Sequence, residues 1–151
     1  MKLIISLLTP LLIGFVGSLT TTSSVQSWYP TLTKPPLTPP SWVFAPVWTS
    51  LYLMMGFSLY LLWSRHRTQK NQKLLYLFLG QLGLNAIWSP VFFGLKLPSL
   101  GLIIIAALWI SLLTLIIKAW KQHRLAAALL IPYLLWVSFA SYLNLAIVWL
   151  N

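Results

Sequence analysis

Tryptophan and carboxamide side chains are the residues of this sequence whose types and spacing could do chemistry. Three stretches place aromatic rings beside amides or small residues, at spacings that put each set on one face of a helix. These sets are Gln81, Asn85 and Trp88; Tyr133, Trp136, Ala140 and Asn144; and Ala45, Trp48, Tyr52 and Gly56. Such faces could line an aromatic pocket with a few amides to orient a ligand. They could equally be packing faces, because small residues let helices approach and amides hydrogen-bond between helices.

Most other chemistry is excluded by composition. The chain has no Asp, no Glu and no Cys. Carboxylate acid–base catalysis, thiolate nucleophiles and oxygen-rich cation sites are therefore absent. The two histidines, His66 and His123, lie in basic connections and are read as solvated loop imidazoles, since two histidines alone make a poor metal site. The sequence predicts no catalytic residue, metal or cofactor.

The elements that must position these residues are membrane spans. Hydrophobic residues make up 59% of the 151 residues and charged residues only 7%, with a mean hydropathy of +0.85. A helix crosses a bilayer with about 20 mostly apolar residues. Five such runs occur, so we expect a single all-α domain over residues 1–151. The expected spans are roughly Leu3–Thr22, Ser41–Ser64, Leu74–Leu95, Pro98–Trp120 and Leu125–Leu150.

Two features of the first span and the basic residues bear on topology. Lys2, an apolar run and the segment TTTSSVQS also resemble a signal peptide, although no Ala-x-Ala cleavage site is present. With five spans, eight of the ten basic residues fall on one side, which predicts a cytosolic N-terminus. The expected location is the cell membrane, with a bacterial outer membrane or an organelle membrane as alternatives. These eight are Lys2, Arg65, Arg67, Lys70, Lys73, Lys118, Lys121 and Arg124, against Lys34 and Lys96 on the other side.

The first connection, WYPTLTKPPLTPPSWVFAPVW, is rich in proline and tryptophan. Proline fixes its own φ and restricts the residue before it, so KPPLTPP predicts a stiff, non-helical segment. Trp28, Tyr29 and Trp42 could anchor this segment at lipid headgroups. Alternatively, the segment could fold over the helix bundle as a lid.

These motifs resemble a known family. WYPTLTKPPLTPPSWVFAPVWTSLYLMMG, QLGLNAIWSPVFFGLKLP and LLIPYLLWVSFASYLN are similar, in order and spacing, to the tryptophan-rich sensory protein and translocator protein family, also called the peripheral benzodiazepine receptor family. The resemblance implies a five-transmembrane-helix bundle with a proline-rich lid loop between helices 1 and 2, often as a homodimer. It also implies a pocket for porphyrins and other hydrophobic ligands, formed here by Trp28, Tyr29, Trp48, Asn85, Trp88, Trp136 and Ala140.

The sequence departs from the family pattern at three points. Leu37 stands where the family loop usually carries tryptophan, which removes a stacking residue. No Lys or Arg follows Tyr142, so the sterol motif proposed for animal members is missing. The family often carries a few acidic residues, whereas this chain has none.

The leading functional hypothesis is a membrane protein that binds, senses or transports porphyrins. Trp48, Trp88 and Trp136 would stack on the macrocycle, Asn85 would make one hydrogen bond, and Lys34 could pair with a propionate. The alternative is an enzyme that degrades bound porphyrin in light, with a pocket tryptophan exchanging an electron. A third possibility is a structural membrane protein whose tryptophans only pack or contact headgroups.

Overall fold

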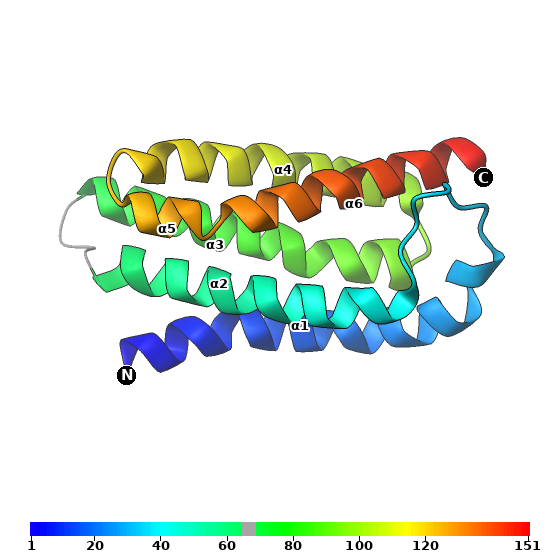
Figure 1. Cartoon of the computed structure of the whole chain (residues 1–151), viewed down its shortest axis with the longest axis horizontal. Helices are drawn as coiled ribbons and strands as arrows, with labels where there is room; N and C mark the ends of the chain where they lie inside the picture. The colour runs from blue at the N-terminus through cyan, green and yellow to red at the C-terminus, as the bar shows by residue number, and fades with distance from the viewer. Residues whose placement is uncertain (65–68) are drawn as a thin grey trace.

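The computed structural model describes residues 1–64 and 69–151, and within these ranges the chain is helical with no strand. Arg65 and Arg67 from the charge count, and His66, expected as a solvated loop imidazole, lie outside the described residues. In chain order the elements are α1 (Lys2–Ser27), η1 (Tyr29–Thr31), η2 (Ser41–Val43), α2 (Phe44–Ser64), α3 (Gln69–Ser89), η3 (Pro90–Gly94), α4 (Pro98–Trp120), α5 (Arg124–Ala128) and α6 (Ile131–Leu150). The long helices lie side by side as a bundle (Figure 1).

Five segments are long and apolar enough to cross a membrane, as the sequence predicts. They are Lys2–Ser27, Ser41–Ser64, Gln72–Gly94, Pro98–Trp120 and Arg124–Leu150. Large aliphatic side chains point outward along them; Ile103 and Leu135 are 67% and 65% exposed. Exposed apolar surface of this kind is costly in water and suits contact with lipid tails. The chain is therefore built as a multi-pass membrane protein.

Two spans contain irregularities at proline. Leu95 N donates to Pro90 O at 2.8 Å, so α3 ends in the wider π-helical turn η3. The fifth span, expected as one helix, is divided into α5 and α6 at Leu129 and Leu130. Pro132 has no N–H to donate to the preceding turn, which explains why the helix restarts there.

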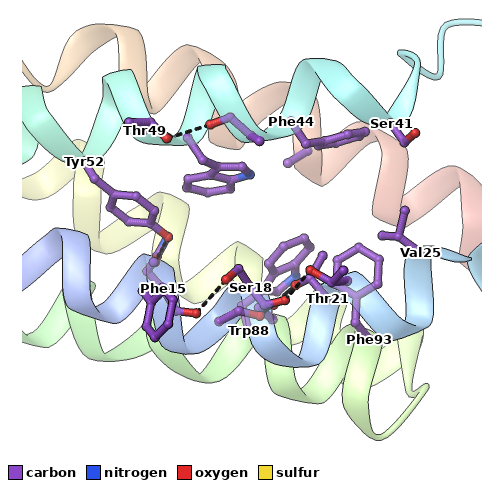
Figure 2. A pocket seen from close by; sticks show the side chains of 18 of the residues that line it. Phe15, Ser18, Thr21, Val25, Ser41, Phe44, Thr49, Tyr52, Trp88 and Phe93 are labelled. Atoms are coloured by element: carbon purple, nitrogen blue, oxygen red, sulfur yellow. Dashed lines mark hydrogen bonds between the residues drawn. The ribbon is translucent and has the colours of Figure 1, made fainter.

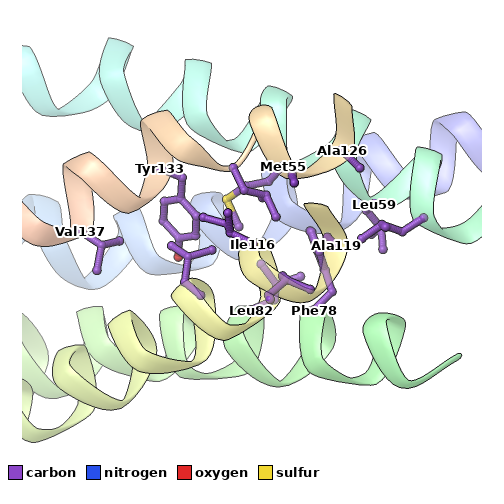
Figure 3. Close-up of a cluster of buried hydrophobic side chains, with 14 of the residues drawn as sticks. Met55, Leu59, Phe78, Leu82, Ile116, Ala119, Ala126, Tyr133 and Val137 are labelled. Atoms are coloured by element: carbon purple, nitrogen blue, oxygen red, sulfur yellow. The ribbon is translucent and has the colours of Figure 1, made fainter. Parts of the chain in front are cut away.

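The core lies in the half of the bundle that includes the N-terminus and the α4–α5 turn. Met55, Phe78, Leu112, Leu115 and Tyr133 come from α2, α3, α4 and α6 and are fully buried together. Figure 3 shows this cluster between the helices. Ser58 Oγ also donates to Ala126 O at 2.8 Å, which fastens α5 to α2. This half of the bundle is therefore closely packed.

The basic residues separate along the bundle axis. Lys2 and the α4–α5 turn with Lys118, Lys121 and Arg124 lie at one end, whereas Lys34 is in the first connection at the other end (Figure 1). His123 departs from the expected solvated loop imidazole, because it is half-buried and its Nδ1 accepts from Ala126 N at 3.3 Å. It thus caps the start of α5, where a free backbone N–H needs an acceptor.

Candidate functional site: an aromatic cavity

A cavity of about 640 Å³ lies in the half of the bundle next to the first connection. Its walls come from α1, α2, α3 and α6, and residues 29, 41 and 42 of the first connection also line it. Volumes of roughly 300–1,000 Å³ are typical of small-molecule sites. Figure 2 shows the space between the α1 residues Ser18 and Thr21 and the α2 residues Phe44 and Thr49.

Six of the seven residues expected at the pocket line this cavity: Tyr29, Trp48, Asn85, Trp88, Trp136 and Ala140. The seventh, Trp28, is not among the lining residues. Its ring meets Phe92 edge-on, with the centroids 5.9 Å apart, and belongs to a small cluster under the first connection. Trp28 thus packs the connection against η3, while a ligand-binding role for the other six stays a prediction.

One wall of the cavity is a set of mutually supporting rings. Trp48 stacks on Tyr52 with centroids 5.4 Å apart and planes 25° apart. It also meets Trp136 edge-to-face at 6.4 Å, and Phe44 meets Trp136 in the same manner at 6.0 Å. Offset and edge-to-face arrangements of this kind are favourable for aromatic quadrupoles. The rings therefore hold one another in place around an open space.

Asn85 links this aromatic wall to the core through two hydrogen bonds. Tyr52 Oη donates to Asn85 Oδ1 at 3.0 Å, and Asn85 Nδ2 donates to Tyr133 Oη at 2.8 Å. A buried amide left without partners would be costly, so these bonds explain how Asn85 is tolerated inside a span. Sequence reasoning found Asn85 but did not pair it with the two tyrosines, since the pairing depends on how three helices pack.

Trp88 is fixed by a second amide. Its Nε1 donates to Asn144 Oδ1 at 3.3 Å, and Asn144 Nδ2 donates to Pro98 O at 2.8 Å. The Trp88 ring also stacks on Phe92, with centroids 5.3 Å apart. This arrangement ties α3, α6 and the start of α4 together, and it uses the indole N–H of Trp88 inside the protein.

The three cavity tryptophans therefore differ in what their N–H groups can do. Trp88 donates within the protein, as described above. Trp136 Nε1 is buried and has no partner among the described residues. Trp48 Nε1 also has no partner in the described part of the chain, but it is not buried. Of the three, Trp88 is the one that uses its N–H within the described part of the chain.

The opposite wall is a polar face of α1 that the sequence analysis did not assign to the site. Ser18, Thr21, Thr22 and Gln26 line the cavity. The spacing of four between Ser18, Thr22 and Gln26 could have signalled a shared helix face. This spacing is hard to recognise, because Thr22 and Gln26 lie within TTTSSVQS, where polar residues occupy nearly every position.

The cavity is open between α1 and α2. Its lining includes exposed residues on both helices, among them Phe15, Ser18 and Thr22 on α1 and Ala45 and Thr49 on α2. Deeper lining residues, such as Asn85, are buried. The space is therefore a recess with an aromatic interior, and its rim is shared by two membrane-spanning helices.

Lys34 lies beside the cavity and not in its wall. Its Nζ donates to Tyr29 O at 3.1 Å and stands 5.0 Å from the centroid of the Tyr29 ring. Burial of the Tyr29 side chain raises its pKa, so the phenol is neutral at physiological pH. Across residues 1–64 and 69–151, no three His, Cys, Asp or Glu side chains come together as a metal site.

Comparison with known proteins agrees with these features. Residues 6–150 match the sequence pattern of the TspO/MBR family. The chain is 46% identical to the tryptophan-rich protein TspO of Archaeoglobus fulgidus, over all of this chain and 97% of that protein. It is 42% identical to the protein of the same name from Chlorobaculum tepidum, over 93% of this chain and 90% of that one. It is also 41% identical to the human translocator protein, over 91% and 82% of the two chains.

Proposed function

The chain belongs to the TspO/MBR family, and from this premise we propose that it binds porphyrins and other hydrophobic ligands in the aromatic cavity. Binding would serve sensing or transport, the functions that the names tryptophan-rich sensory protein and translocator protein suggest for relatives of this chain. The observation that carries the proposal is the cavity of about 640 Å³ lined by Trp48, Trp88 and Trp136.

The proposed ligand follows from the shape and chemistry of the wall. A flat aromatic molecule gains most from rings that are already held in place, because little side-chain freedom is lost on binding. Trp48 and Trp136 would contact its face, and Trp88 would close the far side. Asn85 already holds two tyrosines, so one N–H and one oxygen lone pair of its amide remain, and either could form a hydrogen bond with the ligand.

Charged groups on the ligand would lie at the end of the cavity near the first connection. The Lys34 ammonium group lies beside the cavity, and the chain has no Asp or Glu side chain that could compete with a ligand for it. A porphyrin propionate placed near Tyr29 could displace the carbonyl contact of Lys34 and form an ion pair there. The macrocycle would remain against the aromatic wall.

We further propose that residues 28–43 act as a lid over this cavity. Tyr29, Ser41 and Trp42 line the cavity from the connection, which supports the assignment. The connection is also held to α6, since Thr33 N donates to Asn151 Oδ1 at 2.9 Å. From the family we propose a homodimer in the cell membrane, and from the distribution of basic residues a cytosolic N-terminus.

The proposal is tested by titrating the purified protein with protoporphyrin in the dark while recording tryptophan fluorescence. Saturable quenching at micromolar ligand, weakened by Trp136→Phe and Trp88→Phe, is expected. Trp120→Phe is a matched control, because Trp120 is exposed and outside the cavity. Quenching that does not saturate, or an affinity unchanged from the wild type in both cavity variants, would contradict a stacking role in the cavity.

A second candidate function is light-dependent oxidative breakdown of bound porphyrin. It is favoured by the chain of close rings from Trp136 through Trp48 to Tyr52, which offers nearby electron donors to an excited ligand. Illumination of the complex in air should then bleach porphyrin faster than illumination of free porphyrin in the same detergent. Bleaching at equal rates would reject this activity and leave binding unaffected.

A further inference from the structure

The cavity has two chemically different long walls. The α2 and α6 side presents the rings of Phe44, Trp48 and Trp136, whereas the α1 side adds the hydroxyl and amide groups of Ser18, Thr21, Thr22 and Gln26 to apolar residues such as Phe15 and Val25. Figure 2 shows Ser18 and Thr21 on α1 across the space from Phe44. A ligand that fills the cavity would therefore meet rings along one side and, along the other, hydroxyl oxygen atoms set among apolar residues.

The hydroxyl protons of the α1 wall are already used within the helix. Ser18 Oγ donates to Phe15 O at 2.7 Å, and Thr22 Oγ1 donates to Ser18 O at 2.8 Å. A hydroxyl has one proton to donate and two lone pairs. Ser18 and Thr22 therefore meet the cavity as hydrogen-bond acceptors, and turning either proton toward a ligand would break an existing bond.

The cavity also lacks a positive charge in its wall. No Lys or Arg is among the described lining residues. The neighbouring Lys34 amine lies outside the wall and contacts Tyr29 O. A carboxylate placed against Ser18 and Thr22 would face oxygen lone pairs without a counter-ion, which is unfavourable in a partly desolvated site. An uncharged O–H or N–H group would find two acceptors there.

We propose that Ser18 and Thr22 determine ligand specificity by accepting hydrogen bonds from uncharged donors along one edge of the ligand. This inference rests on the proposed function, since it concerns the same cavity. The favoured ligand is a flat apolar molecule with hydroxyl, amide or protonated acid groups on the edge that faces α1. Ionised groups are directed away from α1, toward the end near Lys34.

The test compares two neutral derivatives of one porphyrin. In the first, both propionates are reduced to propanols; in the second, both are methyl esters. The macrocycle is the same, but only the first carries edge donors. Because a typical hydrogen bond changes affinity by roughly three- to tenfold, the wild-type protein should bind the propanol derivative more tightly by about that factor.

Variants show whether Ser18 and Thr22 cause the preference. Ser18→Ala/Thr22→Val should bring the affinity ratio close to one without weakening the ester. Ser18→Thr/Thr22→Ser keeps both hydroxyls and should restore the ratio. Ser23→Ala/Ser27→Ala is the matched control, because these α1 hydroxyls also donate to their own helix but do not line the cavity.

The outcomes separate this inference from the proposed function. Loss of the preference for the propanol derivative in Ser18→Ala/Thr22→Val, and in no other variant, would support the acceptor role of Ser18 and Thr22. If both derivatives bind saturably and the ratio of their affinities is the same in every variant, the acceptor role of Ser18 and Thr22 is overturned, but ligand binding in the cavity is not. Failure of both derivatives to saturate the wild-type protein would overturn the proposed function together with the inference.

Discussion

Helices α1 and α2 meet in two opposite ways along their length. Near the N-terminus of α1 they touch backbone to backbone: a Cβ built on Gly56 would lie 2.8 Å from Leu7 Cα and 2.9 Å from Ser6 O. Toward the first connection the same helices are separated by the cavity. Tyr52 marks the change, because its ring occupies the place where a side chain on Gly14 would stand.

Residue size on one helix face therefore decides whether these two spans pack closely or remain apart. Glycine lets backbones approach where no hydrophobic driving force exists between helices in lipid. In the cavity half, Trp48 and Tyr52 act as rigid spacers, and the bond from Tyr52 to Asn85 prevents the ring from folding inward. One half is stabilised by close packing and the other by braced rings.

The largest effect should come from destroying the close contact. Gly56→Leu places a branched side chain against backbone atoms of α1 that cannot move away without separating the helices. We expect a loss of about 3 kcal/mol in unfolding free energy or failure to fold, at the upper end of overpacking effects. Thermal unfolding in detergent, followed by circular dichroism, measures it.

Gly80→Ala is the control for that substitution. No atom lies within 4 Å of a Cβ built on Gly80, so Gly80→Ala should leave the stability unchanged or raise it by up to about 1 kcal/mol, the helix-propensity gain of alanine over glycine. Equal destabilisation by both substitutions would mean that the α1–α2 contact does not decide the result, since helix propensity alone favours alanine and leucine over glycine.

The next effect concerns the brace in the cavity half. Asn85→Leu leaves Tyr52 and the fully buried Tyr133 without their shared partner. We expect a loss of about 1–2 kcal/mol, since interhelical hydrogen bonds in membranes contribute modestly and a buried orphan adds to the cost. Chemical denaturation of Asn85→Leu, Tyr133→Phe and the double variant forms a double-mutant cycle. Strictly additive losses would show that the bond between Asn85 and Tyr133 does not stabilise the fold.

A smaller effect distinguishes two tryptophans of the same cavity. Trp88→Phe removes the donor to Asn144, whereas Trp136→Phe removes an N–H that has no partner among the described residues. Both substitutions remove similar volume, so their difference reports the hydrogen bond. We expect Trp88→Phe to be less stable than Trp136→Phe by about 1 kcal/mol in thermal unfolding. The reverse order would mean that ring packing outweighs the bond.

Features with a local signal in the chain could be predicted from the sequence, whereas features that depend on how the helices pack could not. The five spans follow from hydropathy, and the faces that carry Trp48, Asn85 and Trp136 follow from helical spacing. These signals are local in the chain. The α1 wall was missed, because a dense run of serine and threonine has no contrast between its faces. Trp28 lies in a connection without periodicity, so only the folded chain could place it against Phe92.

The smallest effect should follow from loosening the connection that borders the cavity. Asn151 holds Thr33 at two points, accepting from Thr33 N at 2.9 Å and donating to Thr33 O at 3.1 Å. Both bonds are exposed, so Asn151→Ala should change stability by less than about 1 kcal/mol. Ligand dissociation, measured by dilution in a stopped-flow fluorimeter, should nevertheless accelerate several-fold if residues 28–43 cover the bound ligand.

Thr31→Val is the control, because Thr31 Oγ1 bonds only to Trp28 O within the same connection. A dissociation rate that is unchanged in Asn151→Ala would mean that ligands leave through the gap between α1 and α2, whose rim does not involve Thr33.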